Sequence, residues 1–240
     1  ELTTINLALQ NPFVRAEPRV FAGDGIEKMI HAEKVINDDP ASGSIEDYLR
    51  ETQEEYERLI LPREGFDVVI MNPPFTRRER IPANERTKLE RMLGNIISGR
   101  VGYWAYFFAA TDNVIKPYGK LASVTPEEFF SGESAESLRR FMLLGENSNY
   151  RYRIRYVVRS AIDTAFSEGA SYRDYLVVLS KEPKEDLKSS INDQMLFIIL
   201  KKRKDELKDD DIKTISSIIK EIERDIIKQD VYSSDLIDVI

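Results

Sequence analysis

Short apolar runs alternate with longer segments of helical period along the first three quarters of the chain. The runs are rich in β-branched and aromatic residues and are bounded by Gly, Pro, Asp or Ser, which is typical of buried strands. Helices are predicted between them, one from Ser44 with an apolar face from Ile45 to Ile60, and one over 103–115 that ends at the turn 116–119. This alternation predicts an α/β fold with a mostly parallel sheet covered by helices on both faces. The predicted strands lie at residues 20–22, 66–71, 121–124, 154–158 and 175–179.

The pattern changes near residue 182. Residues 194–200 form one more apolar run, which predicts a strand, and isoleucines recur at helical spacing from Ile212 to Ile227. That spacing predicts a helix packed on the body of the protein or on a partner, in preference to a dedicated recognition domain. We therefore expect a main domain over 1–181 and an acidic extension of strand and helix over 182–240.

Composition excludes several kinds of site. The 240 residues include no cysteine, which excludes a disulfide framework, a thiolate nucleophile and Cys-based zinc or iron–sulfur sites. The single histidine, His31, excludes mechanisms that need two imidazoles and is interpreted as an ordinary residue of a helix surface. We expect no metal site. A formal net charge of −7 argues against binding nucleic acid as a nonspecific polycation.

No apolar run approaches the roughly 20 residues that span a bilayer, and the N-terminal segment does not resemble a signal peptide. We therefore expect a cytoplasmic protein without a membrane partner. The chain opens within a helical pattern around Leu7 and without Met, so we also expect it to begin inside a larger protein.

An apolar strand runs directly into the sequence Asn72-Pro73-Pro74-Phe75. Open α/β sheets bind ligands at the carboxyl ends of their strands. The two prolines continue neither helix nor strand, remove two N–H donors and fix two φ angles. The loop is therefore stiff, and it presents carbonyl oxygens and one amide side chain beside an aromatic ring. These acceptors suit a planar group with an amino function, such as a nucleobase.

Together with its strand, this segment resembles the signature of N6-adenine DNA methyltransferases that use S-adenosylmethionine (SAM). The resemblance implies a Rossmann-like class I methyltransferase sheet, incomplete at the N-terminus, with residues 1–181 as the catalytic domain. It also implies that the Asn72 side-chain oxygen and the Pro73 carbonyl accept hydrogen bonds from the amine of a flipped adenine. Pro74 would stiffen the loop and Phe75 would stack on the base. A core aromatic that caps the strand is the alternative for Phe75.

Residues 20–26 resemble the family's strand ending in Gly-Asp, where the carboxylate accepts from the amino group of the SAM adenine. The alternative for Gly-Asp-Gly is an ordinary turn. Residues 5–9 resemble the helix that precedes this strand. The resemblance assigns cofactor binding to Gly23, Asp24, Gly25 and Ile26.

Later motifs follow in the family's order. Residues 106–126 resemble its next helix and strand, 138–140 a further helix, and Phe166 a late motif whose Phe packs against the target base. A core position is the alternative for Phe166. The order is typical of the gamma arrangement of restriction–modification systems. The glycine-rich loop that wraps the methionine part of SAM is not found in the sequence. We therefore expect a fragment, ahead of a subunit completed by another chain or a degenerate relative.

Two groups of basic residues lie near these motifs in the sequence. They would contact phosphates of double-stranded DNA, while solvated faces and structural ion pairs are the alternative. The first lies between Thr76 and Arg100 and includes Arg77, Arg78 and Arg100; the second comprises Arg139, Arg140, Arg151, Arg153, Arg155 and Arg159.

The expected function is site-specific DNA adenine-N6 methylation in a restriction–modification system, with SAM as the methyl donor. A specificity subunit or recognition domain and a nuclease or translocase are further expected partners. An RNA-base or protein-glutamine methyltransferase is one alternative, because Asn-Pro-Pro loops also occur there. A methyltransferase-like scaffold that binds partners through its isoleucine-striped helix is another.

Overall fold

The computed structural model describes residues 24–34, 60–61, 64–98, 100–163, 165–166, 173–184, 195–224 and 231–240. Contacts within the chain divide it into two units, Glu1–Arg63 and Glu64–Ile240. The described part of the first unit holds helix α2 (Gly25–Ile30) and two short parallel strands, β1 (Glu33–Lys34) and β2 (Ile60–Leu61). The predicted strand at 20–22 and most of the predicted helix from Ser44 lie outside the described residues; Ile60, expected on that helix, is instead the first residue of β2.

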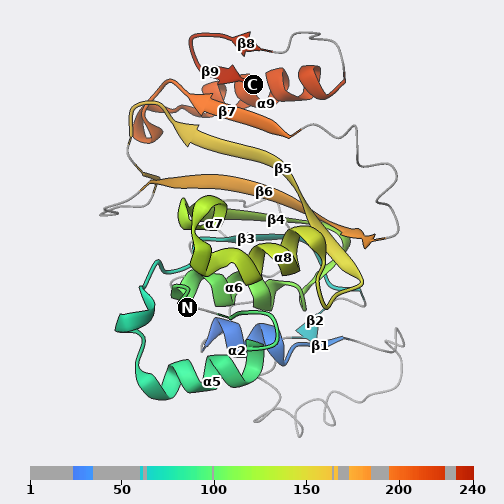
Figure 1. Cartoon of the computed structure of the whole chain (residues 1–240). Coiled ribbons are helices and arrows are strands. Elements are labelled where there is room, and N and C mark those ends of the chain that lie inside the picture. Colours follow the sequence, from blue (N-terminus) through green and yellow to red (C-terminus); the bar gives the residue numbers. More distant parts are fainter. Residues whose placement is uncertain are drawn as a thin grey trace, which may run out of the picture. The chain divides into compact units, whose positions relative to one another are not determined.

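The second unit is built on a seven-stranded sheet in the order β3-β4-β6-β5-β7-β9-β8 (Figure 1). Strands β3 and β4 are parallel, as are β5 and β7, and the remaining neighbours are antiparallel. The strands are β3 (Phe66–Met71), β4 (Ile115–Pro126), β5 (Tyr150–Ser160), β6 (Asp174–Pro183), β7 (Leu196–Leu200), β8 (Tyr232–Ser233) and β9 (Ile237–Val239).

All five apolar runs predicted as strands within the described residues are strands, and the α/β fold class is confirmed. The sheet is mixed, however, where the sequence predicted it mostly parallel. After β5 the chain turns back and β6 pairs antiparallel with it, so β6 lies between β4 and β5 and separates them. An apolar run has the same composition in either direction, so its pattern does not reveal this insertion. The predicted boundary near residue 182 falls at the end of β6, and β7 beyond it joins the same sheet.

The helix predicted over 103–115 is shorter than expected. Helix α6 (Tyr103–Thr111) ends where the Thr111 hydroxyl donates to the Phe108 carbonyl at 2.7 Å, and Ile115 already belongs to β4. The predicted turn at 116–119 is an irregularity in β4 opposite Phe66, with Tyr118 at a φ of 62°. The prediction extended the helix too far because Val114 and Ile115 are both buried and continue the apolar pattern. Burial alone does not distinguish a helix from a strand.

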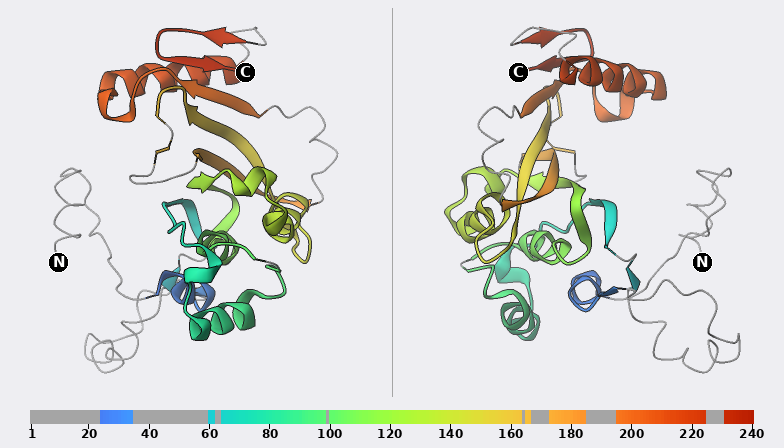
Figure 2. Two further views of the ribbon diagram at one scale, coloured as in Figure 1. Left: turned by 60° about the vertical axis from the view of Figure 1, so that its left-hand side comes forward. Right: turned by 90° about the vertical axis from the view of Figure 1, so that its right-hand side faces the viewer.

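Helices α6 and α8 (Glu136–Leu144) lie on one face of this sheet, as Figures 1 and 2 show. An aromatic cluster fills the space there: the rings of Phe108 and Phe129 stack at 5.5 Å, and Trp104 meets both edge-on. Shorter elements are α7 (Glu128–Ser131) and the 3₁₀ turns η1 (Arg78–Arg80), η2 (Glu133–Ala135) and η4 (Lys204–Glu206); α5 (Ala83–Leu93) follows η1.

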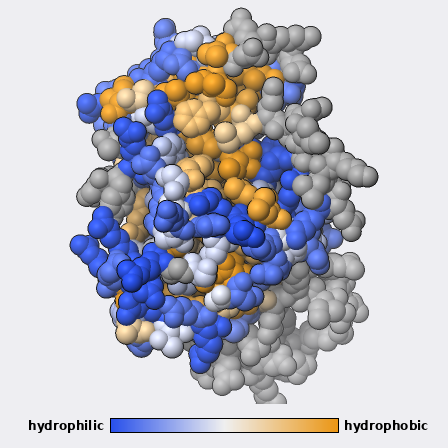
Figure 3. Space-filling model, in the orientation of Figure 1, coloured by the Kyte–Doolittle hydropathy of each residue, from blue (hydrophilic) through white to orange (hydrophobic). Residues whose placement is uncertain are grey.

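Helix α9 (Asp209–Glu223) packs on the body of the protein, as its isoleucine spacing predicted. Its apolar side covers a buried cluster on β7 and β9 formed by Ile198, Leu200, Ile237 and Val239. In Figure 2 the helix lies beside these strands at the end of the sheet opposite β3. On the face drawn in Figure 3, apolar side chains gather over the part of the sheet that contains β5 and β7.

Candidate functional site

The loop that follows β3 lies at the edge of the sheet. Residues 72–77 have no regular structure, because Pro73 and Pro74 lack the N–H groups that would continue the β-ladder. Pro73 is buried and anchors the loop, whereas Asn72 and Pro74 are exposed and Phe75 is half-buried. The amide side chain of Asn72 therefore lies at the surface, at the carboxyl end of β3.

Helix α6 is joined to this loop by a backbone hydrogen bond. The Tyr103 amide donates a hydrogen bond to the Thr76 carbonyl at 2.8 Å. Gly102 allows this approach, since a Cβ there would lie 3.1 Å from the Thr76 carbonyl oxygen and 2.9 Å from the Trp104 ring. The position of Asn72–Phe75 is thus coupled to the N-terminus of α6.

A cavity of about 560 Å³ lies at the end of this loop, where Phe75 lines it; Asn72, Pro73 and Pro74 are not among its lining residues. Phe75 and Trp104 provide its aromatic lining, and Pro126 at the end of β4 closes it from the neighbouring strand. Parallel strands β3 and β4 bring their carboxyl ends to the same edge, which is where open α/β sheets place their ligands. Its charged lining consists of Arg77, Arg78, Arg100, Glu79, Glu127 and Glu128.

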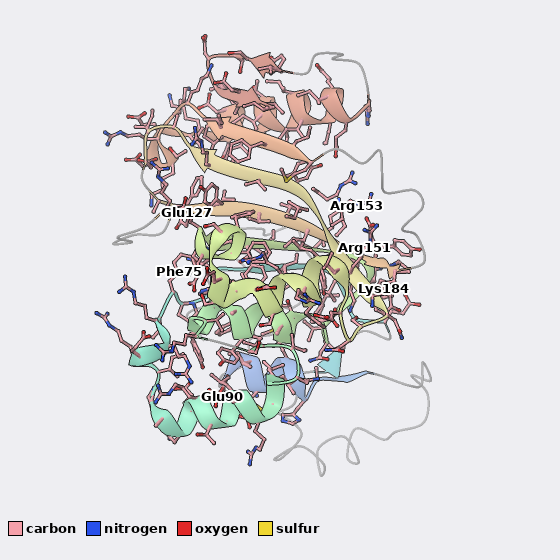
Figure 4. The ribbon with its side chains drawn as sticks, in the orientation of Figure 1. Phe75, Glu90, Glu127, Arg151, Arg153 and Lys184 are labelled. Carbon is pink, nitrogen blue, oxygen red and sulfur yellow. The ribbon has the colours of Figure 1, made fainter. Side chains whose placement is uncertain are left out.

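Two of these charged side chains are held by specific partners. Arg78 pairs with Glu90 of α5 at 3.0 Å, and its Nε is buried without a hydrogen-bond partner among the described residues. Glu128 accepts hydrogen bonds from the Trp104 indole at 3.4 Å and from the Ser134 hydroxyl. Arg78 therefore keeps a donor for an anionic ligand, while the Glu128 carboxylate is fixed in place. Figure 4 shows Phe75 and Glu127 on the same side of the sheet.

Phe166 does not line this cavity. It lies in a second cavity of about 380 Å³, formed by the end of β5 and the start of β6, and its side chain packs on the apolar cluster beneath α9. Its backbone is fixed by the Asp174 carboxylate, which accepts from the Phe166 amide at 2.5 Å, and by the Lys204 ammonium, which donates to the Phe166 carbonyl at 2.7 Å. The structure thus places Phe75 and Phe166 at two separate cavities of one sheet edge.

The predicted cofactor residues belong to the other unit. Asp24 caps helix α2, where one carboxylate oxygen accepts from the amides of Ile26 at 2.9 Å and Glu27 at 3.3 Å. Gly25 is the first helical residue, and Ile26 is completely buried. Gly23 lies outside the described residues.

The second basic group is not gathered at the site, which corrects the expectation that it flanks the motifs. Arg139 donates to the carbonyls of Phe129 at 3.1 Å and Gly132 at 2.7 Å, so it is a structural residue. Arg151 and Arg153 lie at the start of β5, and Figure 4 shows them with Lys184 on the side away from Phe75. Arg159 lies at the end of that strand and lines the second cavity.

Sequence reasoning missed Trp104, Glu127 and Glu128 as lining residues. Trp104 sits in an aromatic helix where nothing marks it out from core residues. The two glutamates follow Pro126. The available signal was a buried strand that ends in Thr-Pro and is followed by acidic residues.

Among the described residues no group of three His, Asp or Glu side chains is arranged to hold a metal ion. In the same part of the chain no helix combines the length and apolarity needed to cross a bilayer.

Comparison with known proteins gives a family for most of this chain. Residues 1–156 match the model of the Eco57I restriction-modification methylase family. The type II methyltransferase M.BanIII of Aneurinibacillus aneurinilyticus is 29% identical over 79 residues, which are 33% of this chain and 13% of that protein. The match to M.BanIII thus covers a small part of its length.

Two solved structures show weak likenesses. The type IIG restriction endonuclease BpuSI matches with a TM-score of 0.37 and 14% identity, over 60% of this chain and 17% of that one. A DrdV–DNA complex solved by electron cryomicroscopy matches with a TM-score of 0.34 and 12% identity, over 65% and 16% of the two chains. Similarities of this size do not support a functional assignment.

Proposed function

Because the chain belongs to the Eco57I restriction-modification methylase family, we propose that it transfers the methyl group of SAM to N6 of an adenine in DNA. The observation that supports this most directly is the exposed amide of Asn72 on a proline-stiffened loop, beside a cavity lined by Phe75.

The loop is suited to an amino group. An adenine N6 is a poor nucleophile because its lone pair is delocalised into the ring. In the proposed reaction the Asn72 side-chain oxygen and the Pro73 carbonyl accept hydrogen bonds from the two N6 protons. These acceptors favour a tetrahedral nitrogen and stabilise the positive charge that develops on it. Since Pro73 is buried, Asn72 is the acceptor that solvent and substrate reach first.

The reaction needs positioning more than acid–base chemistry. When bound, SAM supplies a methyl group already activated on a sulfonium. The amine of the base would accept this methyl group from the sulfonium, whose electron pair would return to sulfur, and N6 would give up one proton to water. The chain's own residues orient the amine and exclude water from one of its faces, which is the role we assign to Phe75.

We propose DNA as the substrate. A target base inside a duplex must be flipped out to be reached. Stacking on Phe75 would recover about 1–3 kcal/mol of the unstacking cost. Arg77 and Arg78 lie on the same cavity and would contact the phosphates next to the flipped base. We propose double-stranded DNA as the partner, with a specificity subunit or recognition domain and a nuclease or translocase in the complete system.

We propose that Asp24 and its neighbours form part of a SAM site; Gly23, one of these neighbours, lies outside the described residues. The Asp24 carboxylate would accept from the adenine amino group of SAM, with Gly23 and Gly25 beside it and the buried Ile26 anchoring α2 beneath them. The capping bonds of Asp24 fix this carboxylate in one orientation. The glycine-rich loop expected for the methionine part is not found in this sequence.

The proposal is tested with the full chain and SAM that carries a tritiated methyl group. DNA, RNA and total protein are offered separately as acceptors, and products from DNA are digested to nucleosides. Label in N6-methyl-2′-deoxyadenosine from DNA supports the proposed function. Label in RNA or protein alone, or in no acceptor, contradicts it.

A further inference from the structure

We propose that the second cavity, between the ends of β5 and β6, binds a phosphodiester group of the DNA strand whose target base enters the first cavity. The inference rests on the proposed function and adds a binding site for the substrate's backbone. Its principal residues are Arg159 and Arg173, which both line this cavity of about 380 Å³.

Residues 160–163, which form one side of the cavity, are held by several hydrogen bonds. The Ser160 side-chain oxygen accepts from the amides of Ile162 at 3.1 Å and Asp163 at 2.8 Å. The Ala161 amide donates to the Leu200 carbonyl at 2.8 Å, which joins the loop to β7. A binding site with such support loses little conformational freedom when it takes a ligand.

The carboxylates of the cavity already serve as acceptors for the protein. Asp163 accepts from the Lys204 amide at 3.0 Å, and Asp174 accepts from the Phe166 amide at 2.5 Å. The Lys204 ammonium stands nearby, where it donates to the Phe166 carbonyl. The cavity and its rim thus combine three cationic side chains, Arg159, Arg173 and Lys204, with two carboxylates that accept hydrogen bonds from backbone amides.

The two guanidinium groups, in contrast, keep their donors. Within the described part of the chain neither Arg159 nor Arg173 has an ion pair or a hydrogen-bonded side-chain partner. The Arg159 Nε is buried and unpaired, and its guanidinium carbon lies 5.8 Å from the centre of the Phe197 ring. A buried donor without an acceptor is costly, so this group indicates an anionic ligand. Guanidinium groups bind phosphate oxygens through paired hydrogen bonds.

The two cavities are next to each other along the sheet edge. Pro126 lines the first cavity and is the direct β-ladder partner of Asp174, which lines the second. The Glu127 amide of the first cavity also donates to the Arg173 carbonyl at 3.1 Å. Adjacent strands lie about 4.8 Å apart, and the rise per nucleotide is about 3.4 Å in duplex DNA. A nucleic-acid strand with one base in the first cavity therefore brings a nearby phosphate to the second.

The lining also suits a nucleotide better than a bare anion. Phe166 and Tyr175 line the same cavity as the two arginines, and Phe166 also packs on the apolar cluster beneath α9. Ile162 adds exposed apolar surface to the lining, with 48% of its surface accessible. Aromatic and apolar surface next to cations is the combination that binds single-stranded or flipped nucleotides.

The test measures how the affinity of the full chain for a fluorescent mixed-sequence DNA duplex depends on salt. Each phosphate contact contributes about 0.9 to the slope of log affinity against log salt concentration. We expect Arg173→Gln and Arg159→Met each to lower the slope by about 0.9, with a loss of affinity at every salt concentration. Arg224→Gln, which removes an exposed arginine at the end of α9, is the matched control and should keep the wild-type slope.

Two further measurements make the outcome decisive. Arg173 is exposed, so its variant should keep the wild-type melting temperature, and Arg159→Lys, which keeps the charge, should keep most of the slope. Inorganic phosphate at constant ionic strength is the second probe. Competition by phosphate that depends on Arg173, with an unchanged slope on DNA, would overturn the proposal. Unchanged slopes in both variants, an equal fall in the control, or no binding of the duplex would overturn it as well. None of these readings uses methyl transfer, so failure here is distinguishable from failure of the proposed function.

Discussion

The backbone amide of Tyr103 donates to the carbonyl of Thr76 at 2.8 Å, which joins the first turn of α6 to the loop that contains Asn72. Gly102 is required for this contact, because a Cβ would come within 2.9 Å of the Trp104 ring and 3.1 Å of the Thr76 carbonyl oxygen. The proposed catalytic loop therefore takes its position from a glycine thirty residues further along the chain.

This relationship predicts a specific effect of Gly102→Ala. The added methyl group must push the Thr76 carbonyl or the Trp104 ring aside and so displace the loop. Small displacements of reacting groups lower rates strongly, and we expect the proposed methyl transfer to fall about tenfold or more. The measurement compares initial rates of label incorporation with the melting temperature from circular dichroism. Equal rates in both proteins would show that the contact does not set the loop position.

Replacing Asn72 tests the proposed chemistry itself. Asn72→Ala removes the exposed acceptor and should lower methyl transfer about 10²–10³-fold, the usual effect of losing one preorganised hydrogen-bonding group. Binding of SAM, measured by calorimetry, should stay nearly unchanged. Asn84→Ala on the exposed side of α5 is the matched control and should retain the wild-type rate. Retained transfer in Asn72→Ala would refute the role assigned to this side chain.

The role proposed for Asp24 can be separated from its capping function. Asp24→Ala loses both, and the lost cap alone costs about 1 kcal/mol. Asp24→Ser keeps a capping oxygen but loses the carboxylate. If the carboxylate holds the adenine end of SAM, both variants should raise the calorimetric dissociation constant. If only the alanine variant does so, Asp24 acts through the helix and the cofactor role is wrong.

Local patterns in the sequence predicted the parts of the site that depend on local rules. The run at 66–71 followed by two prolines could only be a strand that stops, and the structure has β3 ending at Met71. Glu128 and Trp104 reach the same cavity through the packing of α6 and α7, which leaves no short-range signal. Phe166 was expected at the target base, but the antiparallel insertion of β6 places it at the neighbouring cavity. Pairing order among strands depends on long-range contacts that apolar runs do not encode.

The contact between Tyr156 and Glu223 predicts an alkaline weakening of the fold. Burial, followed by the hydrogen bond to Glu223, raises the pKa of Tyr156 from 10.0 to about 12. The folded state holds this proton more tightly, so the contribution is complete below pH 10 and is lost as pH rises toward 12. Urea unfolding at a series of pH values should show a steeper loss of stability above pH 10 in wild type than in Tyr156→Phe. Glu223→Gln should give an intermediate slope, and identical slopes in all three proteins would contradict the assignment.

An ion pair beside the core predicts that the stability losses caused by replacing each partner do not add. The Lys181 ammonium lies 2.9 Å from an Asp112 carboxylate oxygen, which also accepts from the Tyr152 hydroxyl at 2.9 Å. The same ammonium donates to the Ile115 carbonyl at 3.1 Å, so it closes the end of α6 against the start of β4.

Removing one partner of a buried pair typically costs about 3–5 kcal/mol. The lower end of this range is expected here, because the ammonium keeps the Ile115 carbonyl and the Asp112 carboxylate is partly exposed. Asp112→Ala and Lys181→Met should each approach this loss in the free energy of unfolding. The double variant should be far less destabilised than the sum, because the methionine fills the space and no charge is left unpaired. A double-mutant cycle by urea unfolding measures the difference, for which we expect at least about 1 kcal/mol of coupling between contacting residues. Additive losses would mean that solvent compensates each charge and that the pair does not hold α6 to β4.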